Sequence, residues 1–423
     1  MAMLITVLFI LGYAAIVLEH NIHINKAASA LVTAVVCWAV FALATEDKER
    51  VAESLTEHLG DVSGILFFLL GAMVIVELID AHDGFELITE RISTTNKRKL
   101  VWVVGLFAFF LSAVLDNLTT TIVMVSLLRK IIPGHRDRLL FAGLTVIAAN
   151  AGGAWSPIGD VTTTMLWIGG QISAGNIIIK TIIPSLISFV VPALVISARM
   201  KGKLELPPKK PLPAGSTALQ RNGVFFLGVA VLLFVPVFKT ITHLPPFMGI
   251  LFGLGLMWIV TEMIHSGKDE ADKDVLSVNY ALRKVDSPSI LFFLGILLAV
   301  ATLQSTGVLQ QTAAWMDEKV GDIRIITLMI GLLSAIVDNV PLVAAAQGMY
   351  GLEQFPKDHF FWEFLAYCAG TGGSCLIIGS AAGVAAMGME KIDFFWYLRN
   401  ISWLALIGYL AGAAAFLLQA SLT

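Results

Sequence analysis

Apolar segments recur along the whole chain and alternate with shorter polar stretches. They cover residues 3–18, 27–44, 62–80, 100–128, 139–168, 177–198, 222–238, 246–264, 287–305, 324–349, 360–388 and 395–419. Most of them reach the roughly 17 to 25 residues that an α-helix needs to cross the hydrocarbon core of a bilayer. The pattern therefore predicts an all-α polytopic membrane protein with about ten transmembrane helices.

Four of these segments are interrupted near the middle. The segments 100–128 and 324–349 each contain an Asp-Asn pair, and the segments 139–168 and 360–388 each contain a Gly-Gly pair among polar residues. Irregular backbone at membrane depth must face protein or a water-filled cavity. We therefore expect two re-entrant hairpins, at 100–128 and 324–349, and two broken helices, at 139–168 and 360–388. Interruptions at matching positions of two halves indicate the substrate site of a transporter.

The two halves of the chain resemble each other. Residues 65–69 recur as 290–294, residues 112–117 as 334–339, and Gly152-Gly153 as Gly372-Gly373. Three matches in the same order indicate a duplicated unit. The stretch between the halves is rich in proline, which is typical of a linker. We predict a first repeat at 1–200, a linker at 201–221 and a second repeat at 222–423.

Basic residues predict the topology. Both flanks of the segment 100–128 are rich in Lys and Arg, which is typical of cytoplasmic loops. A segment with both ends on one side must turn back, so Asp116 and Asn117 would lie at the tip of this hairpin. Because each half would have an odd number of spans, the second repeat would be inverted, and both termini would lie outside.

Composition narrows the class of protein and its partners. Only 14% of the residues are charged and 57% are hydrophobic, whereas about 25% of a soluble domain is charged. The lipid bilayer is therefore one partner, and the net charge of −3 argues against nucleic acid as another. No basic residue precedes the first apolar segment, which favours a transmembrane helix over a cleaved signal peptide. The three cysteines lie in apolar segments without metal-site spacing, so we interpret them as packing residues.

Three carboxylates lie inside the interrupted segments: Asp116, Asp160 and Asp338. An ionised side chain at the centre of a membrane costs at least about 2.5 kcal/mol, so it is kept where it is paired, faces a cavity or binds an ion. Asp116 and Asp160 could instead cap helices, a role that is compatible with ion binding. Glu77 lies late in its segment, where it could already be at the membrane interface, and is a further candidate proton site.

Neutral oxygen donors surround these carboxylates. They are Asn117, Thr119, Thr120, Thr121, Asn150, Ser156, Thr162, Thr163 and Thr164 in the first half, and Asn339, Thr371, Ser374 and Ser380 in the second. Such oxygens suit a small hard cation such as Na⁺ or Li⁺, and no Cys or His lies in these centres for a softer metal. An Asp can also carry a proton, so one site can hold either ion in turn. The four centres contain no Arg or Lys, which favours a cation over an anion as substrate.

The stretches 112–121 and 150–164 resemble the signature motifs of NhaD-type sodium/proton antiporters. That family belongs to the ion transporter superfamily, which also contains arsenite effluxers and dicarboxylate carriers. The resemblance implies antiport of Na⁺ or Li⁺ against H⁺ without a cofactor, in a bacterial-type inner membrane. It assigns functional roles to Asp116, Asn117, Asn150, Asp160, Thr162, Thr163, Ser334, Asp338, Asn339, Thr371 and Ser374. The superfamily's architecture further implies an elevator-type movement, often in a homodimer.

The resulting hypothesis is alternating access. Asp116 and Asp160 would bind the cation together with Asn117, Asn150 and Thr162, and the Asp338-Asn339 pair would close the site. The two hairpin tips are not chemically equivalent, because Pro341 stands where Thr119 stands in the first half. We interpret the eight histidines as solvated residues of loops and helix ends. His58 and His82 are candidate pH sensors among them, since histidine titrates near neutrality.

Other functions are weighed against this hypothesis. An anion carrier of the same superfamily would have neutral hairpin tips rather than Asp-Asn. An intramembrane aspartyl protease would use Asp116 and Asp160 as its dyad, but the stretch 157–160 lacks the first glycine of that motif and the repeat would be unexplained. A passive channel would not show saturable, pH-dependent exchange. We therefore expect a transporter and not an enzyme.

Overall fold

The structure is a computed structural model that describes residues 1–89, 94–204, 218–266 and 276–422. Every regular element among these residues is a helix, and the only β-type contact among them is an isolated bridge between Asn96 and Lys203. The predicted all-α class is confirmed. Most of the predicted linker 201–221, and residues 267–275, lie outside the described residues.

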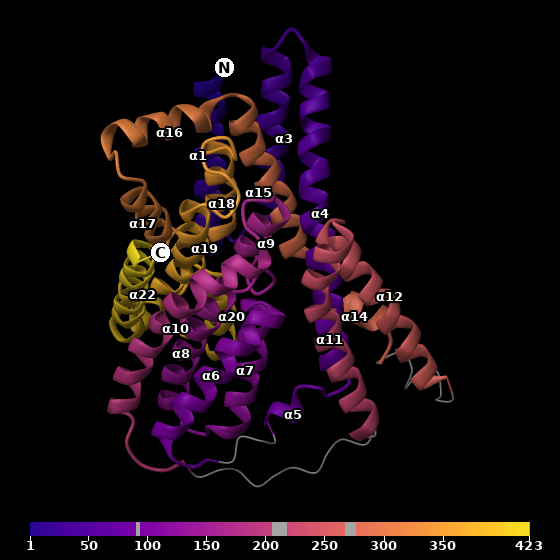
Figure 1. The fold of residues 1–423 in the computed structure, drawn as a ribbon, viewed down its shortest axis with the longest axis vertical. Helices are drawn as coiled ribbons and strands as arrows, with labels where there is room; N and C mark the ends of the chain where they lie inside the picture. Colours follow the sequence, from indigo (N-terminus) through magenta and orange to yellow (C-terminus); the bar gives the residue numbers. More distant parts are fainter. Residues whose placement is uncertain (90–93, 205–217, 267–275, 423) are drawn as a thin grey trace.

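The first half of the chain follows the predicted order of helices (Figure 1). It contains α1 (Ala2–Val17), α2 (Glu19–Ile22), α3 (Lys26–Ala44), α4 (Lys48–Ala81), α5 (Glu86–Thr89), α6 (Lys97–Leu115), α7 (Asn117–Ile131), α8 (His135–Ala154), α9 (Val161–Ile168) and α10 (Ala174–Arg199). The helices α6 and α7 form the predicted hairpin, with Asp116 alone between them. The helices α8 and α9 form the predicted broken helix.

In the second half, a hairpin, a broken helix and a closing helix again follow one another. The elements are α11 (Ala218–Thr242), α12 (Pro246–His265), α14 (Val278–Lys284), α15 (Ser287–Ser305), α16 (Val308–Lys319), α17 (Ile323–Leu333), α18 (Asn339–Met349), α19 (Phe360–Gly372), α20 (Ala381–Glu390), α21 (Phe394–Tyr397) and α22 (Trp403–Leu422). Within the described residues, eight helices are long and apolar enough to cross a membrane. The inversion of the second repeat stays a prediction.

One polar stretch between two of the predicted apolar segments is helical. The stretch 45–61 is polar, but α4 already begins at Lys48 and continues through the apolar span to Ala81. The carboxylate of Asp47 caps this helix by accepting a hydrogen bond from the backbone N–H of Arg50 at 3.0 Å. Polar composition alone does not exclude a helix, and this stretch contains four Glu and two Leu residues, which are strong helix formers.

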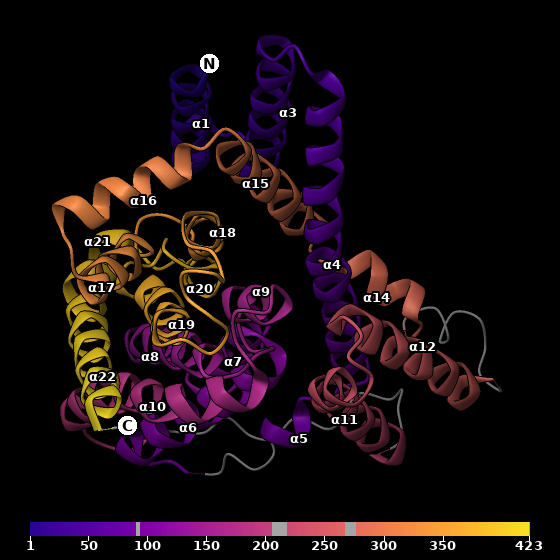
Figure 2. The ribbon, with the colours of Figure 1, turned by 45° about the horizontal axis from the view of Figure 1, so that its top comes forward.

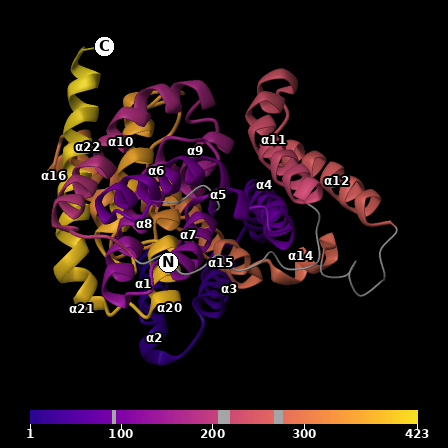
Figure 3. The same cartoon turned by 90° about the horizontal axis from the view of Figure 1, so that it is seen from below.

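The helices form two groups, which are visible side by side in Figures 1 and 2. The hairpin bundle consists of α6 to α10 and α17 to α22, in which α10 packs along α22, α6 against α8 and α17 against α19. The flanking group consists of α1, α3, α4, α11, α12, α14 and α15, in which α3 packs against α15 and α12 against α4. Seen from below in Figure 3, α11 and α12 lie well to one side of the bundle. The groups meet where α18 contacts α15 and where α9 contacts α4.

Gly152 and Gly372 allow the broken helices to approach the hairpins closely. A Cβ atom at Gly152 would overlap the carbonyl oxygen of Phe109 in α6, and one at Gly372 would overlap the carbonyl oxygen of Gly331 in α17. A larger residue would force the paired backbones apart, because the interior is close-packed. The two glycines align in the matching sequence motifs of the two halves, and each lies against the backbone of the hairpin in its own half.

A buried glutamate ties the two halves of the chain together at one end of the bundle. The side chain of Glu390, at the end of α20, is 1% exposed and accepts hydrogen bonds from Arg129 Nε at 2.6 Å and from Arg138 Nε at 2.7 Å. The two arginines lie near the end of α7 and the start of α8. The charge of the buried carboxylate is therefore paired, as burial requires.

Two histidines differ from the expectation of solvated side chains. His82, at the end of α4, and His265, at the end of α12, are 0% and 4% exposed. Their Nε2 atoms lie 2.9 Å apart, and His82 Nδ1 lies 2.7 Å from the carbonyl oxygen of Leu78. A carbonyl only accepts, so Nδ1 of His82 carries a proton, and its Nε2 accepts from His265 when His82 is neutral. The expectation was wrong for this pair because residues at helix ends can still pack between helices.

Candidate functional site

Four helix N-termini of the hairpin bundle meet at one cavity. They belong to α7, α9, α18 and α20, and each is capped by a polar side chain: Asp116, Asp160, Asp338 and Ser380, respectively. The three carboxylates accept backbone N–H groups of their own helices at 2.7, 2.9 and 3.2 Å. Each of the three aspartates therefore caps the helix that follows it. Partial positive charge at helix N-termini also stabilises ionised carboxylates there.

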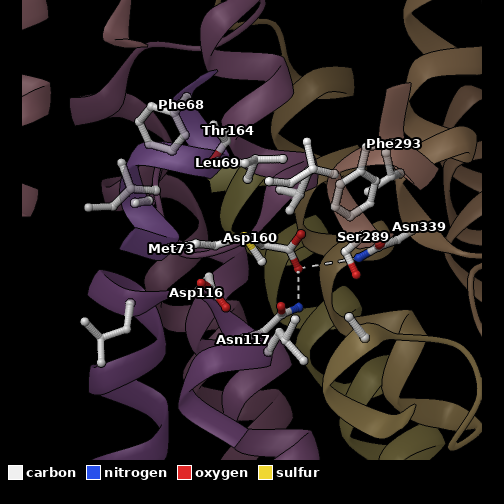
Figure 4. A pocket seen from close by; sticks show the side chains of 18 of the residues that line it. Phe68, Leu69, Met73, Asp116, Asn117, Asp160, Thr164, Ser289, Phe293 and Asn339 are labelled. Atoms are coloured by element: carbon white, nitrogen blue, oxygen red, sulfur yellow. Dashed lines mark hydrogen bonds between the residues drawn. The ribbon is translucent and has the colours of Figure 1, made fainter. Parts of the chain in front are cut away.

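Asp160 lies at the centre of this arrangement and is 2% exposed. Its Oδ1 atom accepts from the backbone N–H and the hydroxyl of Thr162, at 2.9 and 2.8 Å. Its Oδ2 atom accepts from Asn117 Nδ2 at 2.9 Å and faces Asn339 Nδ2 at 3.5 Å (Figure 4). Both hairpins thus direct the amide of their Asp-Asn pair to the same carboxylate oxygen.

Asn150 connects the first hairpin to the second broken helix. Its Oδ1 atom accepts from Asn117 Nδ2 at 3.0 Å, and its Nδ2 donates to the hydroxyl of Ser380 at 2.9 Å. Asn150 is completely buried in α8. The polar side chains of α7, α8, α9 and α20 are therefore linked in one continuous network around Asp160.

Asp116 occupies the one-residue turn between α6 and α7. Its backbone has φ 81°, a conformation that is unusual for a residue other than glycine. Its carboxylate accepts from the backbone N–H of Thr119 at 2.7 Å and from the Thr119 hydroxyl at 2.9 Å. A strained residue of this kind persists only where its surroundings hold it, and such residues cluster at functional sites.

The cavity lies where the hairpin bundle meets the flanking group. Asp116, Asp160 and Asp338 line it on the bundle side. The opposite wall is mostly apolar and comes from α4 and α15, including Phe68, Leu69, Met73, Ile290 and Phe293 (Figure 4). Its volume is about 50 Å³, which is room for a few water molecules or a small ion.

Two further cavities continue from this one along α7. The first has a volume of about 420 Å³ and shares Met73 and Ser289 with the central cavity. The next has a volume of about 140 Å³ and shares Glu77 and Thr119 with the 420 Å³ cavity. Together they follow α7 from its capped N-terminus to Leu127, near the basic end of the hairpin. Glu77, the further candidate proton site, therefore lines this route and not the centre.

Asp338 differs from its counterpart Asp116 in being paired with a base. Lys26, the first residue of α3, places Nζ 3.7 Å from Asp338 Oδ2. We did not predict this contact from the sequence, because we expected no basic side chain in the four interrupted centres. Lys26 comes from outside those centres, and a lysine at the end of an apolar segment has the appearance of an ordinary membrane-boundary residue.

The other predicted hydroxyls mainly bind backbone. Ser156 donates to the carbonyl oxygen of Ala113 at 2.5 Å, and Ser334 donates to that of Ala369 at 3.2 Å. Thr371 and Ser374 donate to carbonyl oxygens within their own broken helix, each at 2.6 Å. These bonds hold hairpins and broken helices in place. The hydroxyls of Thr120 and Thr163 are buried, and no described residue forms a hydrogen bond with them.

Comparison with known proteins agrees with this architecture. A sequence profile of the citrate transporter family, CitMHS, matches residues 5–370. The chain belongs to this family. Among solved structures, a YdaH transporter from Alcanivorax borkumensis has a similar fold, with a TM-score of 0.54 at 11% sequence identity and 88% coverage of each chain.

Several curated relatives of this family member are antiporters. Sodium/proton antiporter 1 of Arabidopsis thaliana is 52% identical over 412 residues, which are 97% of this chain and 71% of that protein. Sodium/proton antiporter 2 of the same plant is 49% identical, over 97% of this chain and 98% of that protein. The Na⁺/H⁺ antiporter NhaD of Alkalimonas amylolytica is 28% identical, over 97% and 89%. The resemblance to NhaD-type proteins is confirmed, and the matched proteins are transporters rather than proteases.

Proposed function

We propose that this chain exchanges Na⁺ or Li⁺ for H⁺ across a membrane, and that Asp160 holds the two ions in turn. The position of Asp160 is the observation that supports this most strongly. Its buried Oδ2 faces amides from both hairpins, and Asp116 lines the same cavity. The names of the antiporter relatives favour the same activity.

The residues around Asp160 could bind a small cation once the amide groups of Asn117 and Asn339 turn over. Asn117 and Asn339 both point Nδ2 towards the carboxylate. If each amide turns about its terminal torsion, Oδ1 takes that place. Two amide oxygens, a carboxylate and the Thr162 hydroxyl would then surround the ion. Such oxygens suit hard cations. The amide nitrogens and the bound cation would alternate at the same carboxylate oxygen.

Competition for the same carboxylates couples the two fluxes. A proton on Asp160 or Asp116 removes the charge that binds Na⁺, and bound Na⁺ disfavours protonation. We propose that the hairpin bundle carries the site from one side to the other against the flanking group, in an elevator-type movement. The cavity wall from α4 and α15 is mostly apolar. The bundle could therefore slide along it while breaking few polar contacts.

An anion carrier is the second candidate function. The convergence of four helix N-termini and the approach of Lys26 would favour a carboxylate ligand, and the family takes its name from citrate transport. Against this, the three aspartates already place negative charge at three of the N-termini. A polyanion such as citrate would meet these charges at short range, which makes a cation the better substrate.

Proton flux in reconstituted vesicles tests the proposal. The purified chain is placed in liposomes that contain a pH-sensitive dye, and NaCl, LiCl, KCl or choline citrate is added outside. We expect external Na⁺ or Li⁺ to enter the liposomes in exchange for internal protons, so the internal pH should rise. Vesicles with the Asp160→Asn variant are the matched control and should show no such rise. A response to choline citrate with none to Na⁺ or Li⁺ would replace the antiporter by an anion carrier.

We also propose a homodimer in a bacterial-type inner membrane, with both termini outside. The broad exposed apolar faces of α11 and α12, including Phe226, Phe252 and Ile259, fit lipid or a second subunit. Relatives from bacteria and from a plant agree with a membrane location. Native mass spectrometry in detergent distinguishes a dimer from a monomer.

A further inference from the structure

Lys26 and Asp338 form an ion pair at the edge of the central cavity. The ammonium group lies 3.7 Å from Asp338 Oδ2 and 4.4 Å from the centre of the Phe292 ring, over its face. The two side chains are 28% and 18% exposed, and both line the cavity. An ammonium between a carboxylate and an aromatic face gains from both contacts.

The equivalent position in the first repeat is built differently. Asp116 aligns with Asp338 in the repeated sequence, and each caps the second helix of its hairpin. Where Asp338 meets Lys26, Asp116 meets the N–H and hydroxyl of Thr119, which has no counterpart because Pro341 occupies the aligned position. The hydroxyl leaves the charge of Asp116 in place, whereas the ammonium balances that of Asp338.

We propose that Lys26 is a resident cation that neutralises Asp338 and thereby confines the transported cation to Asp116 and Asp160. This inference rests on the proposed exchange function. A tethered ammonium cannot leave the protein, so it competes permanently with Na⁺ at Asp338. The carboxylates of Asp116, Asp160 and Asp338, less the charge of Lys26, leave two net negative charges in the cavity when all four are ionised.

Opposite charge changes at this pair should shift cation affinity in opposite directions. Lys26→Gln leaves the charge of Asp338 unbalanced, so the half-saturating Na⁺ concentration at alkaline pH should fall. We expect a fall of at least about threefold, because the added net negative charge lies in the same cavity as the cation. Asp338→Asn leaves Lys26 unbalanced, so the same concentration should rise. In the double variant the two changes cancel, and the value should return towards that of the unchanged protein.

The experiment measures Na⁺-driven proton flux in proteoliposomes at a fixed alkaline pH for these variants. Lys284→Gln is the matched control: it removes one positive charge from the adjoining cavity, where Lys284 contacts the Tyr280 ring instead of Asp338. The control should shift the half-saturating concentration less than Lys26→Gln does. Lys26→Arg keeps the charge and should shift it least among the Lys26 variants.

Each outcome decides the proposal. Equal shifts for Lys26→Gln and Lys284→Gln, or a double variant that stays like Lys26→Gln, would overturn it. If Lys26→Gln does not fold, the direction of the Asp338→Asn shift decides alone, and a fall or no change contradicts the inference. Absence of Na⁺-driven flux in the unchanged protein would defeat the exchange function itself, which is a separate result.

Discussion

At the residue scale, the carboxylate of Asp160 uses both oxygens: Thr162 binds one, and Asn117 and Asn339 face the other. Asp116 is less enclosed and is held by its turn and by Thr119. Capping requires only an acceptor oxygen, whereas carrying a proton or a cation requires an ionisable group. Substitution by asparagine separates these two roles.

We expect Asp160→Asn and Asp116→Asn each to abolish exchange while leaving the protein folded. Asparagine is a good N-cap, so the loss of stability should stay within about 1 kcal/mol. The measurements are Na⁺-driven proton flux and the thermal midpoint of the purified protein. Full exchange in either variant would remove that residue from the coupling step.

Shared carboxylates also make a prediction about pH. Because protonation removes the charge that binds the cation, the half-saturating Na⁺ concentration should rise as pH falls, by up to about tenfold per pH unit for each coupled proton. Measuring it across about three pH units separates this from a sensor such as the His82–His265 pair, which would change the maximal rate instead. A constant half-saturating concentration with a rate that collapses in acid would exclude simple competition.

At the scale of the elements, the site depends on helices that end inside the molecule, where their N-termini meet at one cavity. Each stop is defined locally by an N-cap and, in the broken helices, by glycines that allow the hairpin backbone to approach. These features could be predicted, because a continuous lipid-facing helix rarely contains an Asp-Asn or Gly-Gly pair among polar residues at its centre. The contacts between elements could not, since they depend on which side chains the packed helices bring together.

We expect Gly152→Ala and Gly372→Ala to destabilise the bundle. Each added methyl group would overlap a hairpin carbonyl oxygen, and overpacking of this kind typically costs about 1–3 kcal/mol. Gly60→Ala is the control, because a Cβ there has nothing within 4 Å and should stabilise α4 slightly. Thermal midpoints of the three variants test this, and an unchanged midpoint for Gly372→Ala would mean that the two backbones can separate without cost.

At the scale of the whole molecule, the bilayer makes much of the fold predictable from the sequence. The hairpins and broken helices follow from their polar interruptions. The extension of α4 to Lys48 was missed because hydropathy marks the membrane and not the end of a helix. The Lys26–Asp338, His82–His265 and Glu390–Arg138 contacts were missed because each joins residues far apart in the sequence.

The topology gives a prediction at the same scale. Residues 96 and 134 bound the first hairpin and should lie on the cytoplasmic side, and residues 350–358 should lie outside. Single cysteines at Asn96, Gly134 and Gln354, with the three native cysteines replaced, are treated with an impermeant thiol reagent in intact cells. We expect labelling of position 354 alone, and labelling at 96 or 134 without 354 would overturn this topology.

The pairing of Lys26 with Asp338 also has an electrical consequence. With two net negative charges in the cavity, two protons make the site neutral, whereas one Na⁺ leaves it with one negative charge. Under the proposed exchange, the two loaded forms would therefore differ in charge, and each cycle would move one elementary charge through the membrane. Voltage acts on such a charge with about 2.3 kcal/mol per 100 mV. An inside-negative potential, set with K⁺ and valinomycin, should then drive Na⁺ outwards even when the pH is equal on both sides.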